Sequence, residues 1–134
     1  LVAHDSPPSS VSLCLCDDLL MRQINRRHRQ IDKSTNVLSF PAYDMPGHRL
    51  YQGAHTLLGD IVIAAETMTR EAESLQIPVA DHFMHLFVHG MLHLFGYDHI
   101  DDDTAEAMEL LEIKFLANIG VANPYQDTQL EVDN

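Results

Sequence analysis

The chain has 134 residues, the length of one domain and too short for two. Eight Lys and Arg against twenty Asp and Glu give a net charge of −12, which argues against broad nonspecific binding to nucleic acids. No apolar run approaches the roughly 20 residues that cross a bilayer, so we expect a cytoplasmic protein without a membrane partner.

The first predicted element is a strand over residues 11–16, where larger apolar residues alternate with serine and cysteine. Cys14 and Cys16 stand two apart in this strand and therefore share a face, poorly placed to bridge each other. We expect two buried free thiols in a reducing compartment. A two-cysteine metal clip is the alternative.

A basic helix is predicted next, with Asp17 or Asp18 as its N-cap. Its outward face carries much of the positive charge of the chain. Five of the eight basic residues fall in this region: Arg22, Arg26, Arg27, Arg29 and Lys33. A cluster of this kind is more often a solvated helix face than a binding site. We would therefore interpret it as a binding site only if the fold brings it to other functional residues.

The middle of the chain predicts two strands separated by a long loop. Residues 36–40 form a short strand that Pro41 closes, because proline cannot donate to a ladder. Residues 42–56, with their prolines and glycines, predict a loop of the length that usually means function or mobility. Residues 57–63 are apolar enough for a central strand, and an amphipathic helix follows over residues 66–75.

Two helices complete the chain. The first runs from about residue 79 to 95 and is apolar on more than one face, as expected for a core helix. The second is capped by an aspartate among residues 101–103 and ends at Gly120, with acidic residues after it. Helices and short strands in about equal number predict a small mixed sheet layered against helices, one of them buried.

The core helix carries three histidines at the spacing of a metal site. His89 and His93 are four residues apart and project from one helix face, and Gly96 then allows the turn that returns His99 toward them. Zinc accepts imidazole nitrogens, and catalytic sites commonly use three protein ligands with a fourth position left open. Three imidazoles also accept nickel, copper or cobalt.

This spacing, with a glycine at the turn, is that of the metzincin zinc proteases. Those proteases carry a glutamate directly after the first histidine as general base, and here that position is Gly90. The sequence therefore keeps the metal ligands and lacks the peptidase base. His85 lies on the same helix face one turn earlier. We expect it either to support a metal ligand or to face the substrate, and a histidine that only packs in the core is the alternative.

At these residues the chain resembles the YbeY family of metal-dependent endoribonucleases, which act in ribosomal RNA maturation and ribosome quality control. The resemblance rests on residues 89–99, on residues 35–41 (Thr-Asn-Val-Leu-Ser-Phe-Pro) and on residues 58–63 (Leu-Gly-Asp-Ile-Val-Ile). Family members generally have a further strand and helix before the segment matching residues 11–16. We therefore expect residues 1–134 to form one endoribonuclease domain in which that part is missing or divergent.

The resemblance implies an α+β fold whose central buried helix carries His89, His93 and His99 as ligands of one divalent ion, with zinc expected first. It also places a functionally important arginine of the family at Arg29, and a guanidinium suits a bidentate grip on phosphate. The implied activity is hydrolysis of phosphodiesters in single-stranded ribosomal RNA. The implied partners are that RNA and ribosomal or ribosome-associated proteins.

Three further residues are candidates without an assigned step. Asp98 either orients a histidine or is a solvated turn residue, and Ser39 and Phe40 either line the cleft or pack in a strand. Two other functions remain open. The chain could be a non-catalytic ribosome-assembly or RNA-binding factor with a structural metal, or a zinc metallohydrolase acting on another substrate, including a peptide, which Gly90 disfavours.

Overall fold

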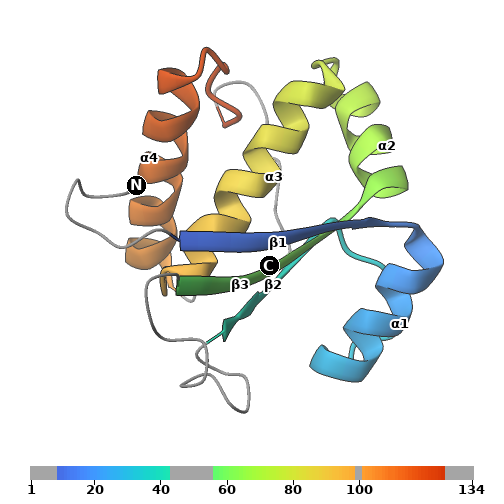
Figure 1. Cartoon of the computed structure of the whole chain (residues 1–134). Coiled ribbons are helices and arrows are strands. Elements are labelled where there is room, and N and C mark those ends of the chain that lie inside the picture. Colours follow the sequence, from blue (N-terminus) through green and yellow to red (C-terminus); the bar gives the residue numbers. More distant parts are fainter. Residues whose placement is uncertain (1–8, 43–55, 99–100, 126–134) are drawn as a thin grey trace.

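A computed structural model describes residues 9–42, 56–98 and 101–125 (Figure 1). The predicted order of strands and helices is confirmed, with boundary shifts of at most two residues. The elements are β1 (Ser9–Cys16), α1 (Asp18–Arg29), β2 (Val37–Pro41), β3 (Thr56–Ala64), α2 (Ala65–Leu75), α3 (Val79–Leu94) and α4 (Asp102–Asn118).

The three strands form one mixed sheet in the order β1-β3-β2. Strand β1 runs parallel to β3, and β2 runs antiparallel to it, with Val37 opposite Ile63 and Pro41 opposite Gly59. Pro41 is thus the last residue of a strand that lies at the edge of this sheet, where its missing N–H costs least. The fold is α+β with a small mixed sheet, as predicted.

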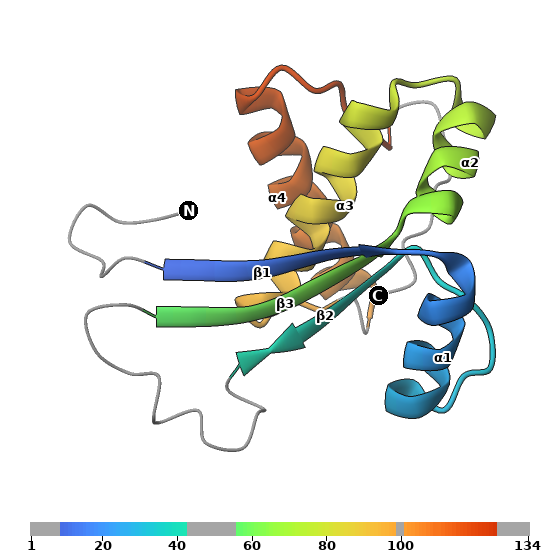
Figure 2. The same ribbon diagram turned by 45° about the vertical axis from the view of Figure 1, so that its right-hand side comes forward.

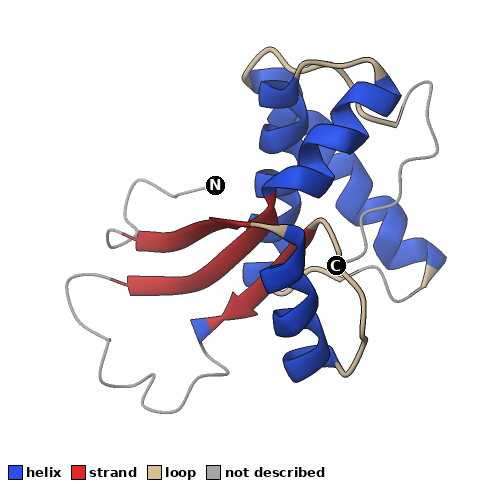
Figure 3. Cartoon of the chain, turned by 90° about the vertical axis from the view of Figure 1, so that its right-hand side faces the viewer, coloured by secondary structure: helices blue, strands red, loops and turns tan. Residues whose placement is uncertain are grey.

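The two faces of the sheet carry different helices (Figures 1 and 2). Alternate residues of β3 point to opposite sides, so Ile61 and Ile63 pack with Leu86 of α3, whereas Val62 packs with Met21 of α1. Helix α1 therefore lies on one face, and α2, α3 and α4 lie on the other. Figure 3 shows the starts of β1 and β3 extending beyond the helices.

Helix α3 is the central helix because it is packed on two sides. One side faces the sheet, and the other contributes Val88 and Leu92 to a cluster with Met108 and Leu116 of α4. A helix enclosed in this way has to be apolar around most of its surface. Any histidine that it carries is then held in a fixed position by its surroundings.

Two aspartates fix the starts of α1 and α4. Asp17 accepts a hydrogen bond from the Leu20 backbone N–H at 2.8 Å, and Asp101 accepts one from the Thr104 N–H at 2.9 Å. The Thr104 hydroxyl oxygen in turn accepts a hydrogen bond from the Asp101 backbone N–H, which completes a capping box. A cap of this kind stabilises a helix by about 1 kcal/mol.

The prediction of two buried thiols is half wrong. Cys16 is buried, but Cys14 is exposed. Helix α1 begins directly after β1 and covers only that end of the sheet, so it reaches Cys16 and leaves Cys14 open to solvent (Figure 2). No helix in the described ranges is long and apolar enough to cross a membrane.

Candidate metal centre

Three histidines of α3 form one row along the helix. His85, His89 and His93 are four residues apart, and the first two are only 1% and 4% exposed. A buried imidazole is costly unless its nitrogens find partners. The partners of this row therefore indicate what each histidine does.

The ring nitrogens of His89 and His93 face each other. Their Nε2 atoms are 3.0 Å apart, and the two rings are nearly perpendicular. Two nitrogens bound to one tetrahedral zinc ion at the usual bond length lie about 3.3 Å apart. The observed separation differs from that value by only a few tenths of an ångström, so this pair fits a shared cation.

The other nitrogen of His89 is held by a buried carboxylate, Glu112 of α4. His89 Nδ1 donates to Glu112 Oε1 at 3.1 Å, and His85 Nε2 donates to the same oxygen at 3.0 Å. The hydroxyl of Tyr125 donates to Oε2 at 2.9 Å. Glu112 is 1% exposed and thus accepts donors from three side chains in the interior.

The surroundings of Glu112 and Tyr125 decide the charge of these two residues. Burial would raise the pKa of Glu112, but the hydrogen bonds from His85 and His89 outweigh it and lower that pKa to about 2. Burial and then the charge of Glu112 raise the pKa of Tyr125. Glu112 is therefore an ionised acceptor at neutral pH, and Tyr125 is a protonated donor.

Gly90 brings α3 against the sheet. A Cβ atom at this position would lie 3.0 Å from Ile61 Cγ2 and 3.1 Å from Ser39 Oγ. The hydroxyl of Ser39 donates to the Gly90 carbonyl oxygen at 3.0 Å, which ties β2 to the histidine helix. The protease glutamate that the sequence lacks at this position would have no space, because the side chain would enter the helix–sheet contact.

Helix α3 ends in a turn made by Gly96. This residue has a φ of +98°, and the Tyr97 N–H donates to the Leu92 carbonyl oxygen at 3.0 Å, as expected for a glycine that ends a helix. Asp98 follows and is exposed. His99 lies outside the described residues. Within those residues, no group of three side chains forms a complete metal site.

Arg29 is the last residue of α1 and is exposed. It makes no hydrogen bond or ion pair to any residue that the structure describes, whereas Arg22 of the same cluster is paired with Asp32 at 2.9 Å. Because α1 and α3 pack on opposite faces of the sheet, the structure does not bring Arg29 into contact with His89 or His93.

Phe40 is partly buried on the α1 side of the sheet. Its ring lies edge-on to His28, with 5.0 Å between the ring centroids, and it packs against the cluster around Met21 and Leu38. Ser39 points the other way, toward α3. The two neighbours therefore serve different faces, as expected for consecutive residues of a strand.

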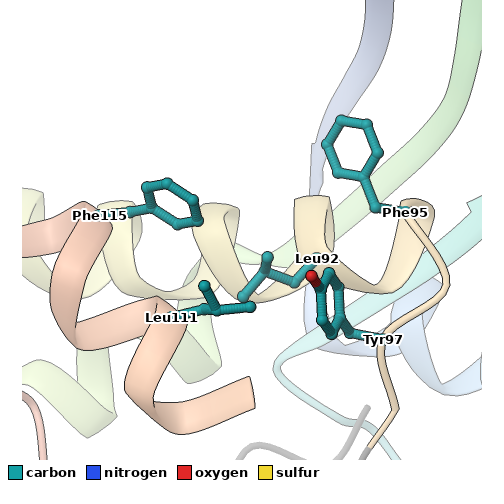
Figure 4. A pocket seen from close by; sticks show the side chains of 5 residues that line it. All are labelled: Leu92, Phe95, Tyr97, Leu111 and Phe115. Carbon is teal, nitrogen blue, oxygen red and sulfur yellow. The ribbon is translucent and has the colours of Figure 1, made fainter. Parts of the chain in front are cut away.

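A pocket of about 340 Å³ lies between α3 and α4 (Figure 4). Leu92 and Leu111 point toward each other in it, and three aromatic residues surround them: Phe95, Tyr97 and Phe115. The Tyr97 hydroxyl is the one polar group among the side chains that line it. The pocket therefore offers no set of ligands for a cation.

The sequence interpretation missed Glu112, and a signal for it was present. Glu112 stands four residues from both Met108 and Leu116, so a carboxylate occupies the inward stripe of α4. A second pair was also missed: Nε2 of the buried His82 lies 2.8 Å from Oε1 of the partly exposed Glu71 and links α3 to α2. Carboxylates at these positions look like ordinary helix surface until the packing of the helices is known.

The family model Endoribonuclease YbeY matches residues 2–120. An Endoribonuclease YbeY of Sinorhizobium fredii is 50% identical over 128 residues, covering 92% of this chain and 69% of that protein. One of Rhizobium meliloti is 51% identical over 119 residues, covering 89% and 69%. A solution structure of a Thermotoga maritima protein is 21% identical with a TM-score of 0.49 and covers 89% of this chain and 75% of that chain.

Proposed function

The chain belongs to the endoribonuclease YbeY family, and from this membership we propose that it is a metal-dependent endoribonuclease of ribosomal RNA processing. It hydrolyses phosphodiester bonds in single-stranded RNA during ribosomal RNA maturation and ribosome quality control. Its partners are this RNA and ribosomal or ribosome-associated proteins, and it works in the cytoplasm.

The observation that carries the proposal is the facing pair of His89 and His93 on the central helix, with their Nε2 atoms 3.0 Å apart. We assign these two nitrogens to one divalent cation, with zinc expected first and His99 as the third ligand. Three neutral imidazoles leave a position open for water or a phosphate oxygen. When bound, the cation supplies Lewis-acid chemistry for phosphodiester hydrolysis.

The chain's own residues then have separate tasks. Glu112 accepts a hydrogen bond from the ring of His89. The Ser39 hydroxyl links the sheet to the backbone of α3 at Gly90, the residue after His89. Arg29 is proposed to grip the phosphate and stabilise its developing charge, a role that a planar guanidinium fits. It is exposed and has no carboxylate partner among the described residues, so its donors are available to RNA.

The two alternative functions have no specific observation in their favour. A peptidase would need its general base beside the first histidine, and the packing around Gly90 leaves no room for one. A non-catalytic factor with a structural metal would use the same histidines, and the relatives that cover most of the chain carry the name of an endoribonuclease.

The test is a cleavage assay on matched single-stranded and double-stranded RNA. The protein is stripped of metal with a chelator, dialysed, and assayed before and after stoichiometric zinc is restored. We expect cleavage of the single strand, loss after stripping and recovery with zinc. RNA binding without turnover under zinc, nickel, copper or cobalt would instead support a non-catalytic factor.

A further inference from the structure

We propose that Glu112 is a positioning residue of the metal centre: its carboxylate fixes the ring of His89 in the tautomer that leaves Nε2 free to bind the cation. This inference rests on the proposed function only in taking His89 as a ligand. It adds Glu112 of α4 to the metal centre, a residue that lies outside the histidine motif of residues 89–99.

The partner of His89 Nδ1 determines which ring nitrogen carries the proton. A neutral imidazole carries one N–H, on either Nδ1 or Nε2. His89 Nδ1 lies 3.1 Å from an oxygen of Glu112, and an ionised carboxylate can only accept hydrogen bonds. The proton of His89 is therefore on Nδ1. The lone pair is on Nε2, which faces the Nε2 atom of His93.

His85 uses the same carboxylate in the opposite sense. Its Nε2 atom lies 3.0 Å from Glu112 Oε1, and its Nδ1 atom is buried without a partner among the described residues. His85 is therefore protonated on Nε2 and His89 on Nδ1. Two histidines one helical turn apart are thus set to different tautomers by one acceptor, and only His89 presents a lone pair at the metal position.

Glu112 is itself held in place by burial and hydrogen bonds. The residue is 1% exposed, and it stands between Met108 and Leu116 on the inward face of α4. Tyr125 follows α4 in the chain. Its hydroxyl donates to Glu112 and also lies 3.2 Å from His85 Nε2. The carboxylate is held from both sides, so the direction of the His89 ring is determined by the packing of α3 against α4.

A stabilising role alone does not account for a carboxylate at this position. Burying a charge is expensive, and an apolar residue of similar volume in a helix interface is often as stable or more so. The carboxylate is needed if the imidazole has to be oriented. Hydrogen-bond partners of metal-bound histidines typically change metal affinity by 10-fold to 100-fold when removed.

The deciding experiment is nitrogen NMR on the metal-free chain, which reports the tautomer of each histidine without any RNA. We expect His89 to be protonated on Nδ1 and His85 on Nε2. In Glu112→Leu the His89 Nδ1 tautomer should lose its preference. In Tyr125→Phe, which removes a donor to Glu112 but touches no metal ligand, the tautomer of His89 should remain.

Zinc affinity, measured by competition with a chelator, gives the second readout. We expect Glu112→Leu to weaken zinc binding by about 10-fold to 100-fold. Met108→Ala is the matched control, because Met108 is a buried neighbour on the same face of α4 that contacts no histidine nitrogen. It should lower the unfolding temperature and leave the zinc affinity of the folded protein unchanged.

If Glu112→Leu does not fold, Glu112→Gln decides. The amide of glutamine can donate as well as accept, so His89 no longer faces a group that only accepts, and we expect its Nδ1 tautomer to lose its preference and zinc affinity to fall by about 10-fold. An unchanged tautomer in the leucine variant, or zinc affinity within twofold of the parent in the glutamine variant, would overturn the inference. Zinc binding that depends on Glu112 in a chain that cleaves no RNA would contradict the proposed function and leave the inference standing.

Discussion

The substitution Gly90→Ala tests the contact that places the histidine helix on the sheet. The added Cβ would lie 3.0 Å and 3.2 Å from two carbons of Ile61 and 3.1 Å from Ser39 Oγ. Overpacking by one methyl group typically costs about 1–3 kcal/mol. Displacing Ser39 from the Gly90 carbonyl oxygen costs about 1 kcal/mol more.

Helix propensity acts in the other direction, because alanine is favoured over glycine inside a helix by about 1 kcal/mol. The balance is a loss of about 1–3 kcal/mol in the free energy of unfolding, which lowers the unfolding temperature by about 3–10 °C. Thermal and urea unfolding of the metal-free protein would measure it. In a Ser39→Ala background the loss should shrink, since one of the crowded atoms is gone. An increase in stability with Gly90→Ala would refute the close contact.

Three further predictions concern other parts of the molecule. Burial raises the pKa of the Cys16 thiol to about 11, so only about 0.1% is thiolate at pH 8, and alkylation followed by mass spectrometry should label the exposed Cys14 first. Equal labelling would contradict the buried position of Cys16. Replacing the N-cap Asp101 with Ala should cost about 1 kcal/mol in urea unfolding, and no loss would mean that the capping box is not formed in solution. Arg29→Ala should lower RNA cleavage by about 10-fold to 100-fold with zinc content unchanged, and Arg27→Ala, its exposed neighbour, should not; equal effects would argue against a specific phosphate contact.

Local chemistry made most of the elements predictable. Pro41 ends β2, Gly96 ends the histidine helix, and aspartates begin α1 and α4, because each residue satisfies or breaks backbone hydrogen bonds within its own segment. The apolar surface of residues 79–95 correctly indicated a helix enclosed on two sides. These features depend on neighbours in the chain and therefore appear in the sequence.

Features that depend on distant segments were harder to predict. Cys14 was expected to be buried, but the alternation in β1 does not show that α1 covers only one end of it. Glu112 was overlooked because a glutamate in an amphipathic helix is normally solvated. Its partners come from α3 and from Tyr125, and only the packing of α4 on α3 brings them together.

The position of the basic cluster relative to the histidines could not be predicted from the sequence either. Arg29 stayed a prediction from family resemblance, since nothing in the spacing of the arginines relates them to the histidines. In the structure, α1 and α3 lie on opposite faces of the sheet, and Arg22 is already neutralised by Asp32. Whether Arg29 acts in cleavage is thus a question for the variant described above.

The central claim is that the facing imidazoles of α3 hold a metal that cleaves RNA, and His93→Ala tests it most directly. Metal content by elemental analysis and cleavage of single-stranded RNA would be measured on the same preparations, with His28→Ala as the matched control for metal content because that histidine is exposed on α1. We expect His93→Ala to lose both bound metal and cleavage, whereas His28→Ala keeps its metal. Cleavage that survives complete loss of metal would contradict the claim.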